Sequence, residues 1–350
     1  MQSRVLVVTV VSLLGALAAV VIGGVPLLAG LVAMAVLALA ALPDGSRRYL
    51  RQRVARIIGS IFLAMAIIWL LVHNYPDSAR QTPTGVVPAM ERYIAWIGDL
   101  VAGEMGDSQY SETVGEGLSR TIPISLQLLA YSQVIALLIA IPGAMLGARY
   151  RGRMVDVFFR AMSFAGLAVP MFVTGLIFLY FFGVGDIELF GLSWGIKILP
   201  TGRYVPLGRD VVEHFKSMAL PSLTLALTTA ATYLVLLRSE LLQQLMSEHV
   251  LLARSKGVSP GRIVRAHALR PAAPSAVAAI AAQSGMILGN LVIIERVFTL
   301  PGFGDYVLVA IGRRDDLAVV GALFVTAAIL AVVNLFADAI LLAVDPRIGR

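Results

Sequence analysis

The sequence predicts an all-α polytopic membrane protein, and three observations support this fold class. First, 58% of the 350 residues are hydrophobic and only 14% are charged, whereas a soluble domain has roughly 45–50% and roughly 25%. Second, several apolar runs reach the roughly 20 residues that a helix needs to cross the hydrocarbon core of a bilayer. Third, these runs are continuous, which excludes a porin-like fold of short alternating strands.

Eight apolar segments are expected to form membrane helices. They lie at residues 5–21, 24–42, 54–73, 122–147, 156–183, 219–241, 271–294 and 317–344. With the N-terminus placed in the cytoplasm, 18 of the 28 Lys and Arg residues fall on the cytoplasmic side and 10 on the outer side, in agreement with the positive-inside rule. Both termini are therefore expected in the cytoplasm, and the formal charge of +7 is attributed to cytoplasmic loops rather than to a nucleic-acid partner.

The first apolar segment has two interpretations. Arg4, the apolar run and Ala16-Leu17-Ala18 have the layout of a secretory signal peptide. A second long apolar run follows after only two glycines, which favours a retained transmembrane hairpin over residues 1–46. Because a hairpin returns the chain to the cytoplasm near Arg47, it leaves the topology of the later helices unchanged.

The basic loop at 242–270 is the most informative segment. Gly257 suits the left-handed position that ends a first short helix, Ser259 suits the cap of a second, and Pro260 fits the first turn of that helix. This order predicts a rigid elbow of two short helices, which can dock in a groove of a soluble partner. Composition alone favours an ordinary basic juxtamembrane loop, and the spacing of the motif reverses that preference.

The loop resembles the coupling loop, called the EAA loop, of ABC-importer permeases of the dipeptide, oligopeptide and nickel type. The resemblance rests on Ala253-Arg254-Ser255-Lys256-Gly257 and on His267-Ala268-Leu269-Arg270. It extends over roughly residues 48–350. The further motifs that carry it are Gly98-Asp99-Leu100, Gly106-Asp107-Ser108, Thr121-Ile122-Pro123, Glu295-Arg296-Val297-Phe298, Leu300-Pro301-Gly302-Phe303-Gly304 and Asp345-Pro346-Arg347.

The resemblance implies a type I permease core of six transmembrane helices in residues 47–350, preceded by the added transmembrane hairpin at 1–46. The permease domain would include an outer segment at 74–121, an outer loop at 184–218 and the cytoplasmic coupling loop at 242–270. The long outer segment is typical of the B-type subunit. The residues implied to couple the chain to an ATPase are Glu248, Ala253, Arg254, Lys256, Gly257, Arg265 and His267.

The resemblance also implies partners: a second permease subunit that forms a heterodimer with this chain, two ABC ATPase subunits and an extracytoplasmic solute-binding protein. ATP and Mg would belong to the ATPase subunits, because this sequence has no Gly-x-x-x-x-Gly-Lys-Ser/Thr phosphate loop. It also has no zinc motif and no nucleophile with a placed base, so we expect neither an enzyme nor a cofactor in this chain. The implied activity is import of peptides or a related solute through the bacterial inner membrane. The alternative is a secondary transporter driven by an ion gradient, which needs internal repeats and charges within the membrane.

The sequence departs from the family pattern in two places besides the hairpin. Tyr75-Pro76-Asp77-Ser78 stands where the family often has Pro-Gly-Asp-Pro, and Leu251-Leu252-Ala253 stands where the wider permease class has Glu-Ala-Ala. Candidate pathway or gate residues are Pro170, a kink candidate, Asn290 and Phe303, for each of which a structural role is an open alternative. Asn334 and Asp338 share one face of the last helix, where a structural role is preferred.

Overall fold

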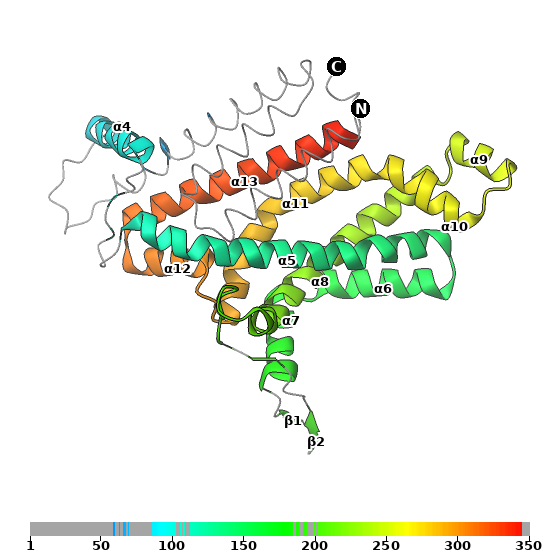
Figure 1. Ribbon diagram of the computed structural model, residues 1–350, viewed down its shortest axis with the longest axis horizontal. Coiled ribbons are helices and arrows are strands. Elements are labelled where there is room, and N and C mark those ends of the chain that lie inside the picture. The colour runs from blue at the N-terminus through cyan, green and yellow to red at the C-terminus, as the bar shows by residue number, and fades with distance from the viewer. Residues whose placement is uncertain are drawn as a thin grey trace. The chain divides into compact units, whose positions relative to one another are not determined.

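The computed structural model in Figure 1 describes most of the chain after residue 85. The described residues are 86–102, 113–184, 187–189, 192–194, 199–200 and 202–344, with the single positions Gly59, Leu63, Ala66, Ile67, Trp69, Gly106 and Ser108. The predicted hairpin at 1–46 lies outside these residues. The described part of the chain falls into two compact units, one formed from residues up to Ile124 and from Gly302–Ala339, and the other from Ser125–Pro301.

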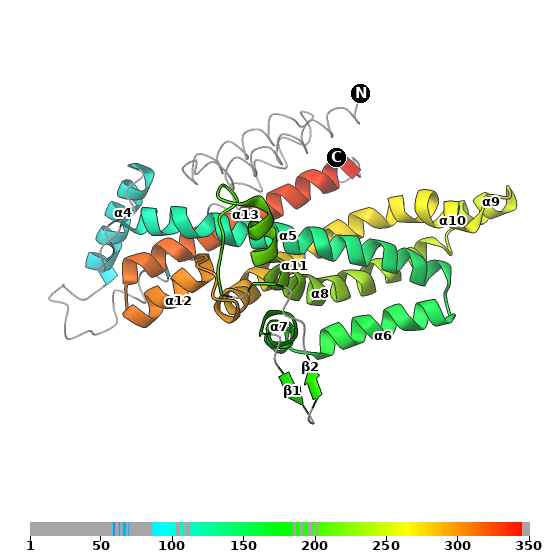
Figure 2. The same ribbon diagram turned by 60° about the horizontal axis from the view of Figure 1, so that its bottom comes forward.

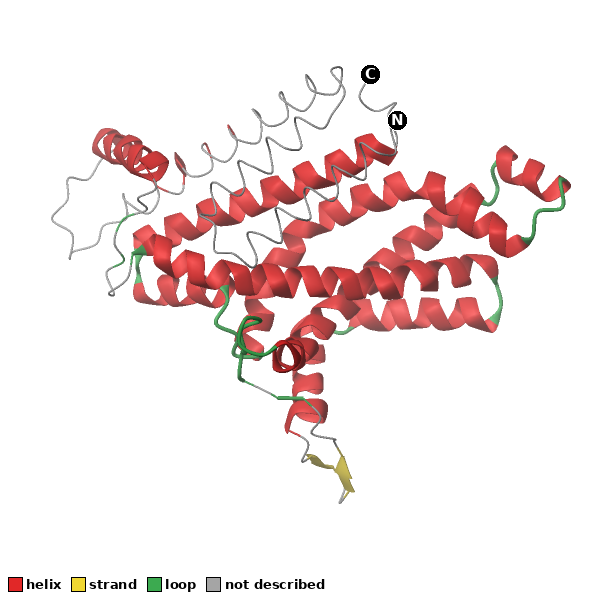
Figure 3. Ribbon diagram, in the orientation of Figure 1, coloured by secondary structure: helices red, strands yellow, loops and turns green. Residues whose placement is uncertain are grey.

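Helices dominate both units, in agreement with the predicted class (Figure 3). The first unit contains α4 (Val86–Ala102), the start of α5 (Val114–Arg149), α12 (Phe303–Arg313) and most of α13 (Asp316–Val344). The second contains the rest of α5 and the elements α6 (Met154–Ala168), α7 (Met171–Phe178), the π-helix η1 (Leu179–Val184), the strands β1 (Ile187–Leu189) and β2 (Leu192–Trp194), α8 (Val211–Gln244), α9 (Glu248–Ser255), α10 (Pro260–Arg262), the π-helix η2 (Ile263–Ala268) and α11 (Leu269–Val297).

The start of α5 is set by local hydrogen bonds. Thr113 Oγ1 accepts a hydrogen bond from the Glu116 amide at 3.2 Å, and the Glu116 carboxylate accepts one from the Thr113 amide at 3.1 Å. This reciprocal capping box satisfies two donors that a helix start otherwise leaves open. The helix therefore begins at Val114, before the predicted span at 122–147, because polar residues can continue a helix beyond its apolar part.

Two helices among the described residues are long and apolar enough to cross a membrane, namely α5 and α8. The prediction of one continuous helix at 156–183 was wrong, because α6 and the segment Met171–Gly183 are bent by 100° at the break between them. Pro170 lacks an amide hydrogen, and Val169 before it is extended with φ −87° and ψ 123°. A residue before proline is pushed out of the helical region by the proline ring, so the break falls at the predicted kink position.

Small residues bring α12 and α13 close to the start of α5 within the first unit. A Cβ placed on Gly117 would lie 2.6 Å from the Tyr306 ring, and one on Gly321 would lie 2.8 Å from Val114. The helix α12 lies between the predicted spans at 271–294 and 317–344, and Gly302 is its N-cap residue. Pro301 and Gly302 are residues that favour a turn, and here they directly precede a helix.

The core of the second unit is an alanine stripe on α5 that faces α8 and α11. Its four residues are spaced four apart in the sequence, so they lie on one face of the helix. They are Ala136, Ala140, Ala144 and Ala148, and each is at most 4% exposed. They pack with Ala226, Ala230, Leu234, Leu237 and Ala272, among others. Figures 1 and 2 show α5, α8 and α11 side by side in this unit. Short side chains let membrane helices approach closely and gain van der Waals contact.

We expect Ala140→Leu to destabilise the protein by about 1–3 kcal/mol, because extra methylene groups have no space in a packed core. Ala140 is fully buried, whereas Ala161 on α6 is exposed, so Ala161→Leu is the matched control. Thermal unfolding in detergent measures the difference. Equal unfolding temperatures for the two variants would contradict the close packing of the alanine stripe.

Candidate functional site

The segment between α8 and α11 forms the elbow that the sequence predicted. The helix α9 ends at Ser255, Lys256 is its C-cap, and Gly257 has a φ of +75°. The Gly257 amide donates to the Arg254 carbonyl at 2.9 Å, and the Val258 amide donates to the Ala253 carbonyl at 3.2 Å. These two bonds form a Schellman motif, in which the left-handed residue ends the helix. Backbone geometry, rather than crowding, favours glycine here, because a Cβ on Gly257 would meet no atom within 4 Å.

The second helix of the elbow begins at Pro260, as predicted, and Ser259 occupies the N-cap position. The expected capping bond is not made, because the Ser259 side chain accepts no hydrogen bond from the helix. The Ser259 carbonyl instead accepts a bond from the Ile263 amide at 3.0 Å. The chain then continues through the π-helix η2 directly into α11, so the elbow and the long helix are one continuous helical path.

The inner side of the elbow is a small apolar core. Val250 on α9 is fully buried, and it is joined by Ile263, Val264 and Ala268 of η2, none of them more than 4% exposed. His249 Nε2 lies 3.3 Å from the His267 carbonyl oxygen, which links α9 to η2. Because packed helices deform less than an open loop, the elbow is suited to moving as a body.

The outer side of the elbow carries two exposed leucines and several exposed basic residues. Leu251 and Leu252 on α9 are 54% and 57% exposed. Of the residues that the sequence singled out, Glu248, Arg254, Lys256, Gly257 and Arg265 are exposed, His267 is partly exposed, and Ala253 is 7% exposed. Ala253 therefore packs inside the elbow. The sequence analysis treated Leu251 and Leu252 only as a departure from a motif, although two adjacent leucines in a basic loop are themselves a signal of a contact surface.

A buried ion pair holds the base of the elbow, and sequence reasoning missed it. Arg238 near the end of α8 donates to both carboxylate oxygens of Asp156 on α6, with Nε–Oδ1 at 2.7 Å and Nη2–Oδ2 at 2.9 Å. The Gly152 amide also donates to Asp156 Oδ2 at 2.9 Å. A bidentate guanidinium pair fixes relative orientation as well as distance. It therefore ties the turn between α5 and α6 to the helix that leads into the elbow.

A hydrogen-bond cluster anchors the outer loop at the opposite end of α8. His214 Nδ1 lies 2.7 Å from the Val205 carbonyl oxygen, so this nitrogen is the donor, and Nε2, at 3.1 Å from the Tyr131 hydroxyl, is the acceptor in the neutral ring. The Tyr204 hydroxyl donates to Gln127 Oε1 at 3.2 Å, and burial raises the pKa of Tyr204 above its ordinary value. These bonds hold Tyr204 and Val205, in the predicted outer loop at 184–218, against α5 and the start of α8.

The candidate pathway residues fall in different places. Pro170 is exposed at the break between α6 and α7, and Asn290 is partly exposed on α11 in the same unit, whereas Phe303 is 6% exposed in the first unit. Asn334 on α13 is partly buried, and the side chain of Asp338 lies outside the described residues. Within the described part of the chain, no three metal-ligating side chains gather.

The described residues include two helices long and apolar enough to span a membrane and a packed elbow between α8 and α11. These features fit a membrane-embedded transport subunit. Residues 136–350 match the family described as the binding-protein-dependent transport system inner membrane component. The chain belongs to this family, whose members are permease components of ABC transporters.

Similar proteins come from several bacteria. A Brucella suis protein, named provisionally as a peptide permease, is 32% identical over 75% of this chain and 80% of its own length. The dipeptide transport system permease protein DppB of Lactococcus lactis is 26% identical over 86% of this chain and 99% of its own length. The glutathione transport system permease protein GsiC of Escherichia coli is 27% identical over 86% of this chain and 98% of its own length.

We expect Arg238→Met to cost about 3 kcal/mol of stability, because it leaves the buried Asp156 carboxylate without its partner. The double change of Arg238→Met with Asp156→Asn should restore part of that loss. Lys216→Met is the control, since the Lys216–Glu213 pair on the same helix is exposed and should contribute nothing measurable. Thermal unfolding in detergent checks this. Equal losses for the single and double variants would show that Arg238 acts through packing alone.

Proposed function

We propose that the chain is the permease subunit of an ABC importer that carries peptides across the bacterial inner membrane. One observation carries the proposal: the rigid elbow around Gly257 presents Leu251 and Leu252 within a basic surface, directly between α8 and α11. The names of the similar proteins from Brucella suis, Bacillus subtilis and Lactococcus lactis support peptides as the cargo. Membership of a binding-protein-dependent family speaks against the secondary transporter.

The elbow would act as the joint to an ATPase subunit. Leu251 and Leu252 would enter an apolar groove of that subunit, because burying a leucine side chain is worth about 1.5–3 kcal/mol. Lys256 and Arg265 would face acidic groups at the rim of the groove, where charges set orientation and association rate more than affinity. Arg254 would support this surface from the side of α8, toward which its side chain extends. Glu248 and His267 would contribute to the same surface. Ala253 would pack α9 against the elbow core.

The remaining subunits follow from this role. Two ATPase subunits would bind ATP and Mg, a second permease would complete the membrane part, and a solute-binding protein would deliver the cargo from outside. The long outer segment supports a B-type subunit in a heterodimer. Movement of the ATPases would reach α8 and α11 through the elbow and open the pathway to each side in turn.

The proposed domain division is a hairpin at 1–46 and a permease domain at 47–350. The alignments with the Lactococcus and Escherichia relatives take in nearly the whole of those proteins but leave 14% of this chain outside the match. That share is close to the length of the hairpin. We place both termini in the cytoplasm, since the 18 to 10 distribution of basic residues supports this orientation.

We expect Gly257→Asp to reduce uptake at least about tenfold in the assembled transporter, since an unpaired charge in an interface costs more than 1.4 kcal/mol. Gly257→Asn is the matched variant: Asn and Asp both tolerate a positive φ, and neither Cβ meets a neighbouring atom. Gly257→Asn should therefore keep most of the uptake. The measurement is transport of a labelled peptide into vesicles, with ATP hydrolysis recorded in parallel.

Gly208→Asp in the outer loop serves as the control for adding a charge, because Gly208 also has open space around it. Normal uptake by a well-expressed Gly257→Asp variant would overturn the proposed coupling role. Equal loss in Gly257→Asp and Gly257→Asn would show that backbone geometry, and not charge, limits transport. Peptide specificity is tested separately by identifying the ligand on the solute-binding protein that copurifies with the complex.

A further inference from the structure

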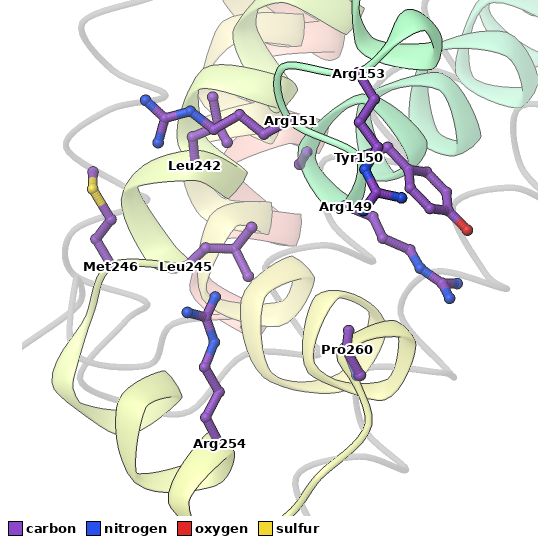
Figure 4. A pocket seen from close by; sticks show the side chains of 10 residues that line it. Arg149, Tyr150, Arg151, Arg153, Leu242, Leu245, Met246, Arg254 and Pro260 are labelled. Atoms are coloured by element: carbon purple, nitrogen blue, oxygen red, sulfur yellow. The ribbon is translucent and has the colours of Figure 1, made fainter.

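A basic pocket lies where α5 and α8 end and the elbow begins (Figure 4). Its volume is about 530 Å³. Arg149, Tyr150, Arg151 and Arg153 line it from the end of α5 and the following turn, and Arg254 lines it from α9. Figure 4 shows the Arg254 side chain extending toward the end of α8. Two segments that are about one hundred residues apart in the sequence therefore place four arginines around one space.

The positive charge of this pocket is not balanced by acids within it. None of the residues that line it is Asp or Glu. The nearby carboxylate of Asp156 is already held by Arg238 and by the Gly152 amide. Among the described residues, the ion pairs given by the structure involve none of the four lining arginines. Four positively charged side chains around one space repel one another. An anion from outside the chain would therefore stabilise the four arginines in this position.

Two of the arginines are ordered by an aromatic ring rather than by a carboxylate. The Arg149 guanidinium carbon lies 5.0 Å from the centre of the Tyr150 ring, and that of Arg153 lies 6.0 Å from it. These are cation–π distances. Arg149 also lies so close to Gly261 that a Cβ on that glycine would be 3.0 Å from the guanidinium. The pocket is thus partly organised before any anion enters.

The position of the pocket favours a lipid as the source of the anion. It lies at the ends of α5 and α8, the two described helices that are long and apolar enough to span a membrane. The apolar part of α5 ends just before Arg149, and arginines that follow an apolar span are typical of the headgroup region on the cytoplasmic side. Next to Arg153, α6 begins with Met154, which is 83% exposed, and Phe158 on the same helix is 58% exposed. A lipid whose headgroup occupies the pocket would have its acyl chains beside this apolar surface.

We propose that the arginine pocket binds the phosphate of an anionic phospholipid. Guanidinium groups match phosphate oxygens with paired hydrogen bonds, and basic pockets at the cytoplasmic ends of membrane helices recognise acidic headgroups. The lipid would bridge the turn between α5 and α6 to the elbow, since Arg254 belongs to α9. It would thereby make the stiffness of the elbow depend on lipid composition. The proposal needs only a membrane-embedded chain and holds whether or not the cargo is a peptide.

The test uses the assembled transporter in nanodiscs of phosphatidylcholine with or without phosphatidylglycerol, and native mass spectrometry counts the lipid retained after transfer to detergent. The variant is Arg151→Gln with Arg153→Gln, which leaves Arg254 and the docking surface intact. Loss of two guanidinium contacts should weaken retention of phosphatidylglycerol about 25-fold, at about fivefold for each arginine. Arg262→Gln with Arg270→Gln is the control, because both residues are exposed in the loop that carries Arg254 and neither lines the pocket.

The proposal is supported if the wild type and the control retain phosphatidylglycerol and the pocket variant does not. Equal retention by all three proteins overturns it. If inorganic phosphate binds to the wild type in detergent and phosphatidylglycerol does not compete, the source of the anion is free phosphate and the lipid assignment is wrong. If the pocket variant keeps the lipid but loses the ATPase subunits, the arginines pair with carboxylates of that partner, which also overturns the proposal.

Discussion

The close approach of α5 to α8 and α11 is the constraint on which the candidate site depends. The alanine stripe leaves no room between these helices for a longer side chain, and a Cβ on Gly143 would lie only 2.7 Å from Leu234. Because α8 and α11 are held on the same surface, the elbow that joins them has both of its ends fixed. A force on the elbow is then passed to two packed helices rather than absorbed by a loop, since a packed interior transmits strain.

Two features at the base of the elbow extend this constraint. The Asp156–Arg238 pair ties α6 to α8 shortly before α8 ends, and the π-helix η2 continues the elbow into α11. A π-helical turn departs from regular helix geometry and is frequent at functional sites. The path out of the elbow is therefore rigid on the α8 side and contains an irregular turn on the α11 side.

The sequence predicted what depends on local chemistry and missed what depends on distant contacts. The elbow follows from Gly257 and Pro260, whose backbone preferences act within a few residues, and the structure confirms it. The break at Pro170 was foreseen as a kink, but hydropathy alone extended one helix through it. Asp156 and Arg238 are 82 residues apart, so no pattern within a window could pair them. For the same reason, the sequence analysis missed the arginine pocket, whose lining residues come from the turn after α5 and from α9.

Under the proposed function, the two exposed leucines of α9 let a loop that departs from the motif still serve docking. Where the wider permease class has Glu and Ala, this chain has Leu251 and Leu252, both more than half exposed. Exchanging a charged residue for an apolar one moves binding energy from electrostatics, which salt screens, to burial of apolar surface, which it does not. Under the same proposal, the basic residues of the elbow would keep the orienting role. An ATPase partner fitted to this chain would therefore have an apolar groove centre and an acidic rim, and its association should respond to salt more in rate than in final affinity.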